Sequence, residues 1–176
     1  WLGNYTGKSI KNLVIDSWTT ESMGWQGALL VSEAAANSTY ENITIKDSVV
    51  TGGTVRNGLA ALIGIVRTTT VNINNVRVEN TKLLRNSGNF GFIVGRNENG
   101  TVNMDGIYLV DNTIGRATAA ANAEASGRGV VAGETTGATS MKNIAVLNTT
   151  FADGVTVLGI LSGCLKVGDD GASAGS

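Results

Sequence analysis

The chain repeats one pattern of apolar and polar positions along its length. In each copy a polar residue precedes two aliphatic residues at alternate positions, after which Asp or Asn returns. This alternation predicts a half-buried β-strand whose aliphatic side chains point toward a core. These alternating segments are residues 10–16, 41–47, 74–80, 105–111 and 142–148. The residues expected to point inward are Leu13, Ile15, Ile43, Ile45, Val76, Val78, Ile107, Leu109, Ile144 and Val146.

A second repeated pattern is a short apolar run that closes with Gly or Ser. These apolar segments are residues 27–32, 60–64, 91–95, 129–133 and 159–163. We expect the residue two positions before each closing residue to stack on its equivalents in an inward column, because solenoids bury apolar faces by stacking neighbouring repeats. That column consists of Leu30, Leu62, Ile93, Val131 and Leu161.

The two patterns recur with a common spacing. The closing residues of the apolar segments stand at positions 32, 64, 95, 133 and 163, and the polar openings of the alternating segments at 12, 42, 74, 105 and 143. The intervals are 32, 31, 38 and 30 in the first series and 30, 32, 31 and 38 in the second. The long interval falls at the same place in both, which locates an insertion of roughly seven residues within 114–128, expected to form a loop or short helix.

Repetition at this spacing predicts an all-β fold, a right-handed parallel β-helix of about 4.5 coils with a period near 31 residues. The helix is expected to span residues 1–167, and the Gly-, Ser- and Ala-rich residues 168–176 to form a tail or linker. A leucine-rich or other α-containing solenoid would need amphipathic stretches of helical period, which no copy contains. A sandwich or barrel is the other alternative, although its strands need not repeat at a fixed spacing.

Asn residues recur where the alternating segments begin. We expect Asn12, Asn42, Asn75 and Asn143 to form a partial ladder at one corner of the helix, bonded between adjacent coils and interrupted by Gly106. The same segments close with Asp or Asn followed by Ser or Thr, which predicts turns stabilised by bonds from these side chains to the backbone.

The apolar segments are apolar on both sides of the expected strand. Such strands are normally covered on both faces, so we expect the outward residues to form an assembly surface covered by a second chain or a flanking segment. This predicted assembly surface comprises Leu29, Val31, Ala61, Ile63, Phe92, Val94, Val130 and Ala132. Unpaired strand edges at the two ends of the helix also favour head-to-tail stacking or continuation into further coils.

Composition narrows the partners and the chemistry. Charged residues make up 15% of the chain and the formal net charge is −1, so a surface for nucleic acid is not expected. No apolar run approaches the roughly 18 residues of a membrane span, so membrane insertion is not expected. The chain has no His and a single Cys, Cys164, which removes an internal disulfide and the usual zinc ligands. Neither a metal ion nor another cofactor is therefore expected.

One of the apolar segments carries a resemblance to a known family. Residues 91–102, Gly-Phe-Ile-Val-Gly-Arg-Asn-Glu-Asn-Gly-Thr-Val, resemble the GLUG repeat of bacterial surface proteins, which reads roughly G-G-L-V-G-x-N-x-G-x-I. Residues 129–137 keep part of this motif, whereas residues 64–70 lack its Asn and its later Gly. The resemblance implies a β-helical array in a secreted adhesin or in the non-catalytic region of a surface protease. It implies an extracellular or cell-surface location and no active site.

Enzymes of the pectate-lyase type share the parallel β-helix and need clustered carboxylates for Ca²⁺, or paired carboxylates for hydrolysis. Here the acidic and basic candidates are spread about one per coil, which favours roles in turn capping and solubility. We therefore predict no catalytic, cofactor-binding or metal-binding residues. The candidates weighed are Asp16, Asp47, Glu79, Asp105, Asp111, Asp153, Lys11, Lys46, Arg77 and Lys142.

The leading functional hypothesis is an extracellular structural or adhesive module, part of a filament or a larger surface protein, and not an enzyme. One alternative is a polysaccharide lyase or hydrolase on the same fold, and another is a glycan-binding module without catalysis. Trp1, Trp18 and Trp25 either form a platform for sugars or cover an open end of the core. The expected partners are further copies of the chain or further coils, with glycan contact as the alternative.

Overall fold

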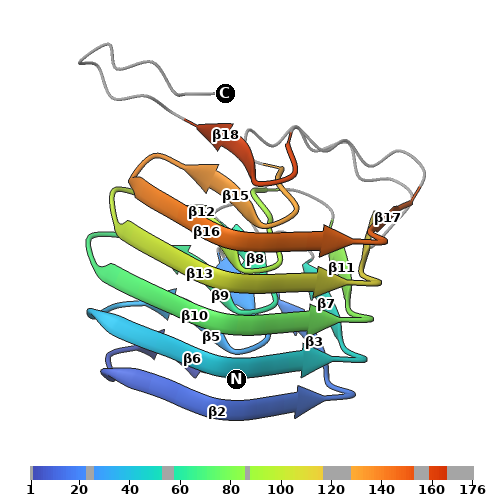
Figure 1. The fold of residues 1–176 in the computed structure, drawn as a ribbon, viewed down its shortest axis with the longest axis horizontal. Coiled ribbons are helices and arrows are strands. Elements are labelled where there is room, and N and C mark those ends of the chain that lie inside the picture. Colours follow the sequence, from blue (N-terminus) through green and yellow to red (C-terminus); the bar gives the residue numbers. More distant parts are fainter. Residues whose placement is uncertain are drawn as a thin grey trace.

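The fold is a stack of parallel β-strands, as Figure 1 shows. The computed structural model describes residues 2–22, 26–52, 58–85, 88–116, 128–152 and 159–165. Every named element in these ranges is a β-strand, and the pairs between strands are parallel. The prediction of a parallel β-helix is therefore confirmed. In Figure 1 the strands at the front run from left to right while the chain climbs from blue to red and returns behind, which makes the helix right-handed.

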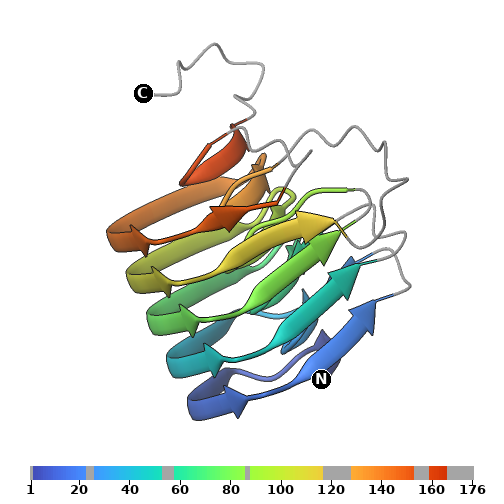
Figure 2. The same ribbon diagram turned by 90° about the vertical axis from the view of Figure 1, so that its right-hand side faces the viewer.

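Three sheets form the walls of the helix, and Figure 2 shows their strands edge to edge. The long sheet has the order β16-β13-β10-β6-β2, the short sheet β17-β14-β11-β7-β3, and the return sheet β1-β5-β9-β12-β15-β18. A further pair joins β4 to β8. The long sheet contains β2 (Ser9–Asp16), β6 (Ser38–Lys46), β10 (Thr70–Glu79), β13 (Thr101–Val110) and β16 (Ala138–Leu147).

The strands of the other sheets are shorter. The short sheet contains β3 (Thr19–Ser22), β7 (Val49–Gly52), β11 (Lys82–Arg85), β14 (Thr113–Arg116) and β17 (Thr150–Phe151). The return sheet contains β1 (Leu2–Tyr5), β5 (Val31–Ala34), β9 (Ile63–Val66), β12 (Val94–Asn97), β15 (Ala132–Thr135) and β18 (Ser162–Leu165). The extra pair is β4 (Gln26–Ala28) with β8 (Gly58–Ala60).

The alternating segments lie in the long sheet with the expected faces. Ile43 pairs with Val76 and Val76 with Ile107, so the inward positions of successive coils stack directly on one another. These side chains are buried in the middle coils, whereas Leu13 in the first coil and Ile144 in the last are only partly buried. Stacking on both sides is therefore needed for full burial of the core.

The apolar segments are not straight strands, and this corrects the predicted assembly surface. In the second coil β8 ends at Ala60, the chain bends at residues 61–62, and β9 begins at Ile63. The backbone N–H of Leu62 donates to the carbonyl of Phe92 in the next bend. Because the chain turns sharply, consecutive side chains can all face the interior, and residues 58–66 form an unbroken buried run. The eight residues expected outside are all buried: Leu29, Val31, Ala61, Ile63, Phe92, Val94, Val130 and Ala132.

Glycine makes these bends possible. A Cβ on Gly58 would lie 2.1 Å from the carbonyl oxygen of Gly64, and a Cβ on Gly133 would lie 2.1 Å from the carbonyl oxygen of Gly95. No real side chain tolerates such a distance to backbone. Gly58 therefore lets the two legs of its own bend approach closely, whereas the closing residue Gly133 lets its coil pack against the preceding coil at Gly95.

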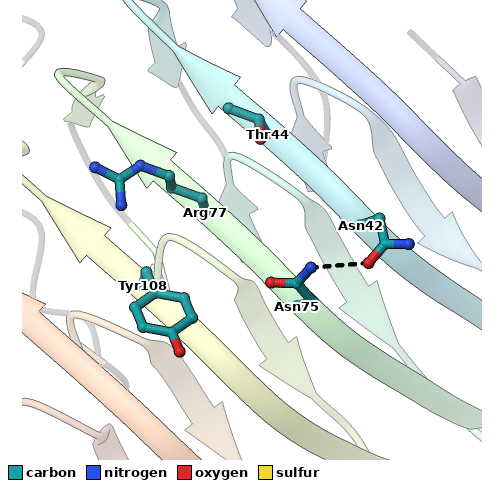
Figure 3. A pocket seen from close by; sticks show the side chains of 5 residues that line it. All are labelled: Asn42, Thr44, Asn75, Arg77 and Tyr108. Atoms are coloured by element: carbon teal, nitrogen blue, oxygen red, sulfur yellow. Dashed lines mark hydrogen bonds between the residues drawn. The ribbon is translucent and has the colours of Figure 1, made fainter.

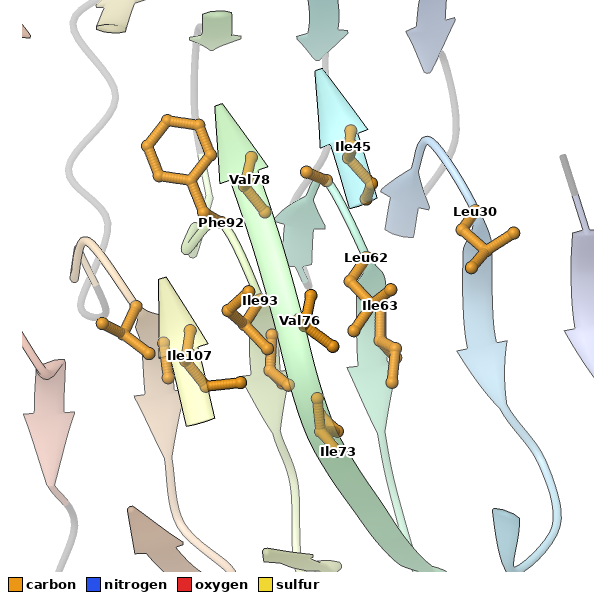
Figure 4. Close-up of a cluster of buried hydrophobic side chains, with 14 of the residues drawn as sticks. Leu30, Ile45, Leu62, Ile63, Ile73, Val76, Val78, Phe92, Ile93 and Ile107 are labelled. Atoms are coloured by element: carbon orange, nitrogen blue, oxygen red, sulfur yellow. The ribbon is translucent and has the colours of Figure 1, made fainter. Parts of the chain in front are cut away.

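The column of aliphatic side chains at the bends is complete in four of its positions. Leu30 is 6% exposed, and Leu62, Ile93 and Val131 are fully buried. Figure 4 shows Leu62 and Ile93 beside Val76, which comes from β10 of the long sheet. The fifth member, Leu161, is 49% exposed at the end of the stack.

Some expected features lie at the limit of the described residues. Strand β14 occupies Thr113–Arg116, so the first residues of the segment expected to be inserted belong to a strand. Residues 117–127, Asp153, Trp1 and Trp25 lie outside the described residues, as do residues 166–176 with the predicted tail.

Tyr40, in β6, allows a test of core burial by pH. Its ring is buried against Tyr5, and burial raises the pKa of its phenol from 10.0 to about 12, despite a hydrogen bond donated by the Ser38 hydroxyl. The unfolded chain therefore ionises at lower pH than the folded one. The contribution of Tyr40 to stability is full below about pH 10 and is lost as pH rises toward about 12.

We expect Tyr40→Phe to reduce the loss of stability between about pH 8 and about pH 11 by roughly 1 kcal/mol. Urea unfolding of both proteins at the two pH values measures this difference. Equal losses in the wild type and the variant would show that the phenol is not shielded from water.

Candidate functional site

Asn side chains form a ladder on the outer face of the long sheet. The amide of Asn42 donates to Oδ1 of Asn12 at 3.0 Å, and the amide of Asn75 donates to Oδ1 of Asn42 at 2.8 Å. Gly106 occupies the next position, and Asn143 donates instead to Asp105 at 2.7 Å. The ladder thus joins three of the four predicted residues and stops where Gly106 was expected to interrupt it.

The ladder lies at a bend of the wall that each long strand passes through without interruption. Its members are exposed. The four Asn residues have φ between 50° and 56°, and Gly106 has φ of 69°. Asn and Gly adopt this left-handed conformation most readily, so the recurrence of Asn reflects a kink in each strand as well as the hydrogen bonds.

A second ladder lies where the long strands end. Asn80 donates to Asp47 at 2.6 Å and Asn148 donates to Asp111 at 3.0 Å, and all four residues have positive φ. Beside it the buried Asn112 accepts from the Thr81 backbone and donates to the Val78 carbonyl. These bonds join adjacent coils at the turn, so the Asp and Asn residues stabilise the stack.

The interruption at Gly106 adjoins a shallow groove. Its volume is about 320 Å³, and it opens on the outer face of β6, β10 and β13. Figure 3 shows Thr44, Arg77 and Tyr108 bordering it on one side and the Asn pair on the other. The groove is lined by Asn42, Thr44, Asn75, Arg77 and Tyr108.

Charged residues on the long sheet face are largely paired. The ammonium group of Lys46 lies 2.9 Å from Asp16, and this hydrogen bond, with one from Ser17, lowers the pKa of the Asp16 carboxyl. Arg77 lies 2.7 Å from Glu79. A third pair joins Lys11 to Glu41 at 2.6 Å.

The acidic residues weighed as catalytic candidates that the structure describes are engaged by neighbouring side chains, and Lys46 lies in register between Asp16 and Glu79. Asp47, Asp105 and Asp111 each accept a hydrogen bond from an Asn of a neighbouring coil, and Asp16 and Glu79 pair with bases. Within the described ranges no group of three or more His, Cys, Asp or Glu residues could hold a metal ion. The same ranges contain no helix long and apolar enough to cross a membrane.

An ion-pair network lies beside the return sheet and was not predicted from the sequence. Arg67 contacts Glu33 at 2.9 Å and Glu98 at 3.1 Å, and Arg96 continues the chain of charges to Glu134 at 3.0 Å. The Glu134 side chain is only 3% exposed. One feature of the sequence could have predicted this network: a charged residue stands one to three positions after the closing residue of most apolar segments.

This network is organised for stability more than for chemistry. Gln26 donates to Glu33 and Asn89 donates to Glu134, so these two carboxylates each have a basic partner and an amide partner, while Glu98 lies between Arg67 and Arg96. A buried carboxylate needs such partners to remain charged. The network links consecutive coils, and its carboxylates are held in ion pairs and hydrogen bonds.

Comparison with known proteins gives no match. No family model, no curated protein and no solved structure matches this chain.

The strained position of Asn42 gives a test of the ladder. We expect Asn42→Ala to be less stable than Asn42→Gly by about 1–2 kcal/mol, because both variants lose the same hydrogen bonds but only Ala resists positive φ. Urea unfolding of the two variants measures the difference. If Ala and Gly were equally stable here, the left-handed backbone would not be the constraint that selects Asn.

Proposed function

We propose that this chain is an extracellular structural or adhesive module, forming part of a longer β-helix or filament on a cell surface. The polar side chains of its outer face serve the stacking of coils through ladders and ion pairs. Polar groups that stabilise the stacking of coils along the whole face are what an elongated structural module requires.

The exposed end of the core carries this proposal. Leu161 is 49% exposed, whereas its equivalents in the preceding coils are at most 6% exposed. Ile160 and Phe151 are also exposed at this end of the stack, whereas Ile114, the partner of Phe151 in the preceding coil, is fully buried. Exposed apolar side chains in one region favour association, and another coil would cover them as each earlier coil is covered.

Further coils fit this end better than a directly stacked second copy. Among the described strands the return sheet has six members and the long sheet five. If β2 of a second copy paired in register with β16, its β1 would occupy the position of β18. The same pairing would place Lys11 beside Lys142, which is unfavourable for like charges. A second copy can therefore continue the sheets in register only by displacing β18, although its apolar side chains can still associate with the exposed end.

The resemblance to the GLUG repeat supports the same proposal. The motif-like segment 91–102 contains Gly91 and Gly95, and a Cβ at either position would lie within 2.7 Å of backbone atoms. A glycine-closed bend that stacks on its neighbours would recur naturally in a long array. The location and the adhesive role proposed here rest on this resemblance.

Equivalent Leu residues give a matched pair of variants. We expect Leu62→Asp to prevent folding, because it places a carboxylate in the centre of the core. Leu161→Asp should keep the fold, as measured by circular dichroism, and should weaken the concentration-dependent association expected of the wild type.

Sedimentation analysis of wild type, Leu161→Asp and the control Val14→Asp measures this association. Val14 is 62% exposed on the long sheet, so its substitution should change neither folding nor association. A wild-type chain that stays monomeric at high concentration, and is unaffected by Leu161→Asp, would contradict the proposed role of this end.

A further inference from the structure

We propose that the groove beside Gly106 binds a neutral carbohydrate chain. This inference rests on the adhesive part of the proposed function and names the site and ligand class for it. The site is the outer-face groove lined by Asn42, Thr44, Asn75, Arg77 and Tyr108.

Register between coils builds the two sides of this groove. Arg77 pairs with Thr44 on β6 and with Tyr108 on β13, so these three side chains form one row across the strands. Asn42 and Asn75 form a second row two residues earlier. Gly106 would be the next member of that row, and its missing side chain leaves space beside Tyr108.

The interrupted ladder leaves an acceptor at the groove. Asn75 uses its amide nitrogen to donate to Asn42, and among the described residues its Oδ1 accepts no hydrogen bond. Figure 3 shows this oxygen on the side of Asn75 that faces β13. A ligand hydroxyl could donate to it at the position that an Asn amide occupies elsewhere in the ladder.

The row of Arg77 adds donors and an aromatic surface. Arg77 donates from Nε to Glu79, and its other guanidinium nitrogens have no hydrogen-bond partner among the described residues, so they can donate to a ligand oxygen. Tyr108 is 42% exposed, and it offers both an apolar ring face and a hydroxyl. A sugar ring has the matching combination of apolar C–H faces and hydroxyl groups.

Charge on the surrounding surface favours a neutral sugar. The Arg77 charge is balanced by Glu79, and Lys46 and Lys11 on the same face are balanced by Asp16 and Glu41. A polyanionic chain would find little uncompensated positive charge to attract it.

An extended peptide fits this face poorly. Strands β10 and β13 are paired on both sides, so their backbone groups are not available to add a strand. Side-chain hydroxyl, amide and aromatic groups are the chemistry that the groove presents.

Binding can be tested on the whole chain by calorimetry and NMR titration. The probes are neutral hexasaccharides of glucose, mannose, galactose or N-acetylglucosamine, with hexagalacturonate as the acidic comparison. We expect saturable, weak binding of at least one neutral probe, because the site is shallow and open. Hexagalacturonate should bind more weakly than that probe.

Variants of the groove locate the site. Tyr108→Ala and Arg77→Ala should each weaken binding by about tenfold or more, since few contacts dominate small interfaces. Asn75→Gly accommodates positive φ and removes the acceptor, and it should also weaken binding. Val14→Ala, in the same row at the edge of the sheet, should leave affinity unchanged, and thermal melts confirm that each variant is folded.

The proposal would be overturned by the absence of saturable binding to every neutral probe, by tighter binding of hexagalacturonate, or by wild-type affinity in Tyr108→Ala and Arg77→Ala. These outcomes would leave the proposed structural role intact, because the association measurement with Leu161→Asp tests that role separately. A chain that associates through its exposed end but binds no sugar would remain a structural module without this site.

Discussion

In-register pairing between successive coils is the constraint on which the rest of this structure depends. Each coil contributes one strand to each wall. Apolar side chains stack on apolar ones, and polar on polar, only if the backbone follows the same path in every coil. Positive φ at Asn42, Asn75 and Gly106 sets one kink of that path, and the glycine-closed bends set another. The core is therefore a result of backbone geometry repeated faithfully, and aliphatic columns follow from it.

Much of this architecture was predictable because short sequence patterns determine each strand and these patterns repeat in every coil. Alternation identified the long strands, the common spacing identified the solenoid, and recurring Asn residues identified the ladder. The apolar segments were the main error, because an uninterrupted apolar run reads as a strand buried on both faces. The bend at residues 61–62 buries both sets of side chains within one chain, and nothing in the run itself distinguishes it from a straight strand except the closing glycine.

The site features were harder to predict because they depend on neighbours about one coil apart. Arg77 and Tyr108 are separated by 31 residues and become adjacent only through the pairing of β10 with β13. The ion-pair partners Arg67 and Glu33 likewise meet across coils. A spacing series read from single positions has an uncertainty of about one residue, and such a shift moves a side chain to the other face of a strand.

Departures from the repeat are where a uniform solenoid can acquire specificity. The repeat requires a left-handed residue at position 106, and either Asn or Gly satisfies that backbone requirement. Asn would extend the ladder and close the surface. Gly keeps the same path but leaves a hollow, and Oδ1 of Asn75 then accepts no hydrogen bond from the described residues. The outward neighbours, such as Tyr108, are unconstrained by the core and can differ in each coil. A fold stabilised by its inward columns can therefore change its surface one coil at a time, and a binding groove needs only one coil that departs from the pattern.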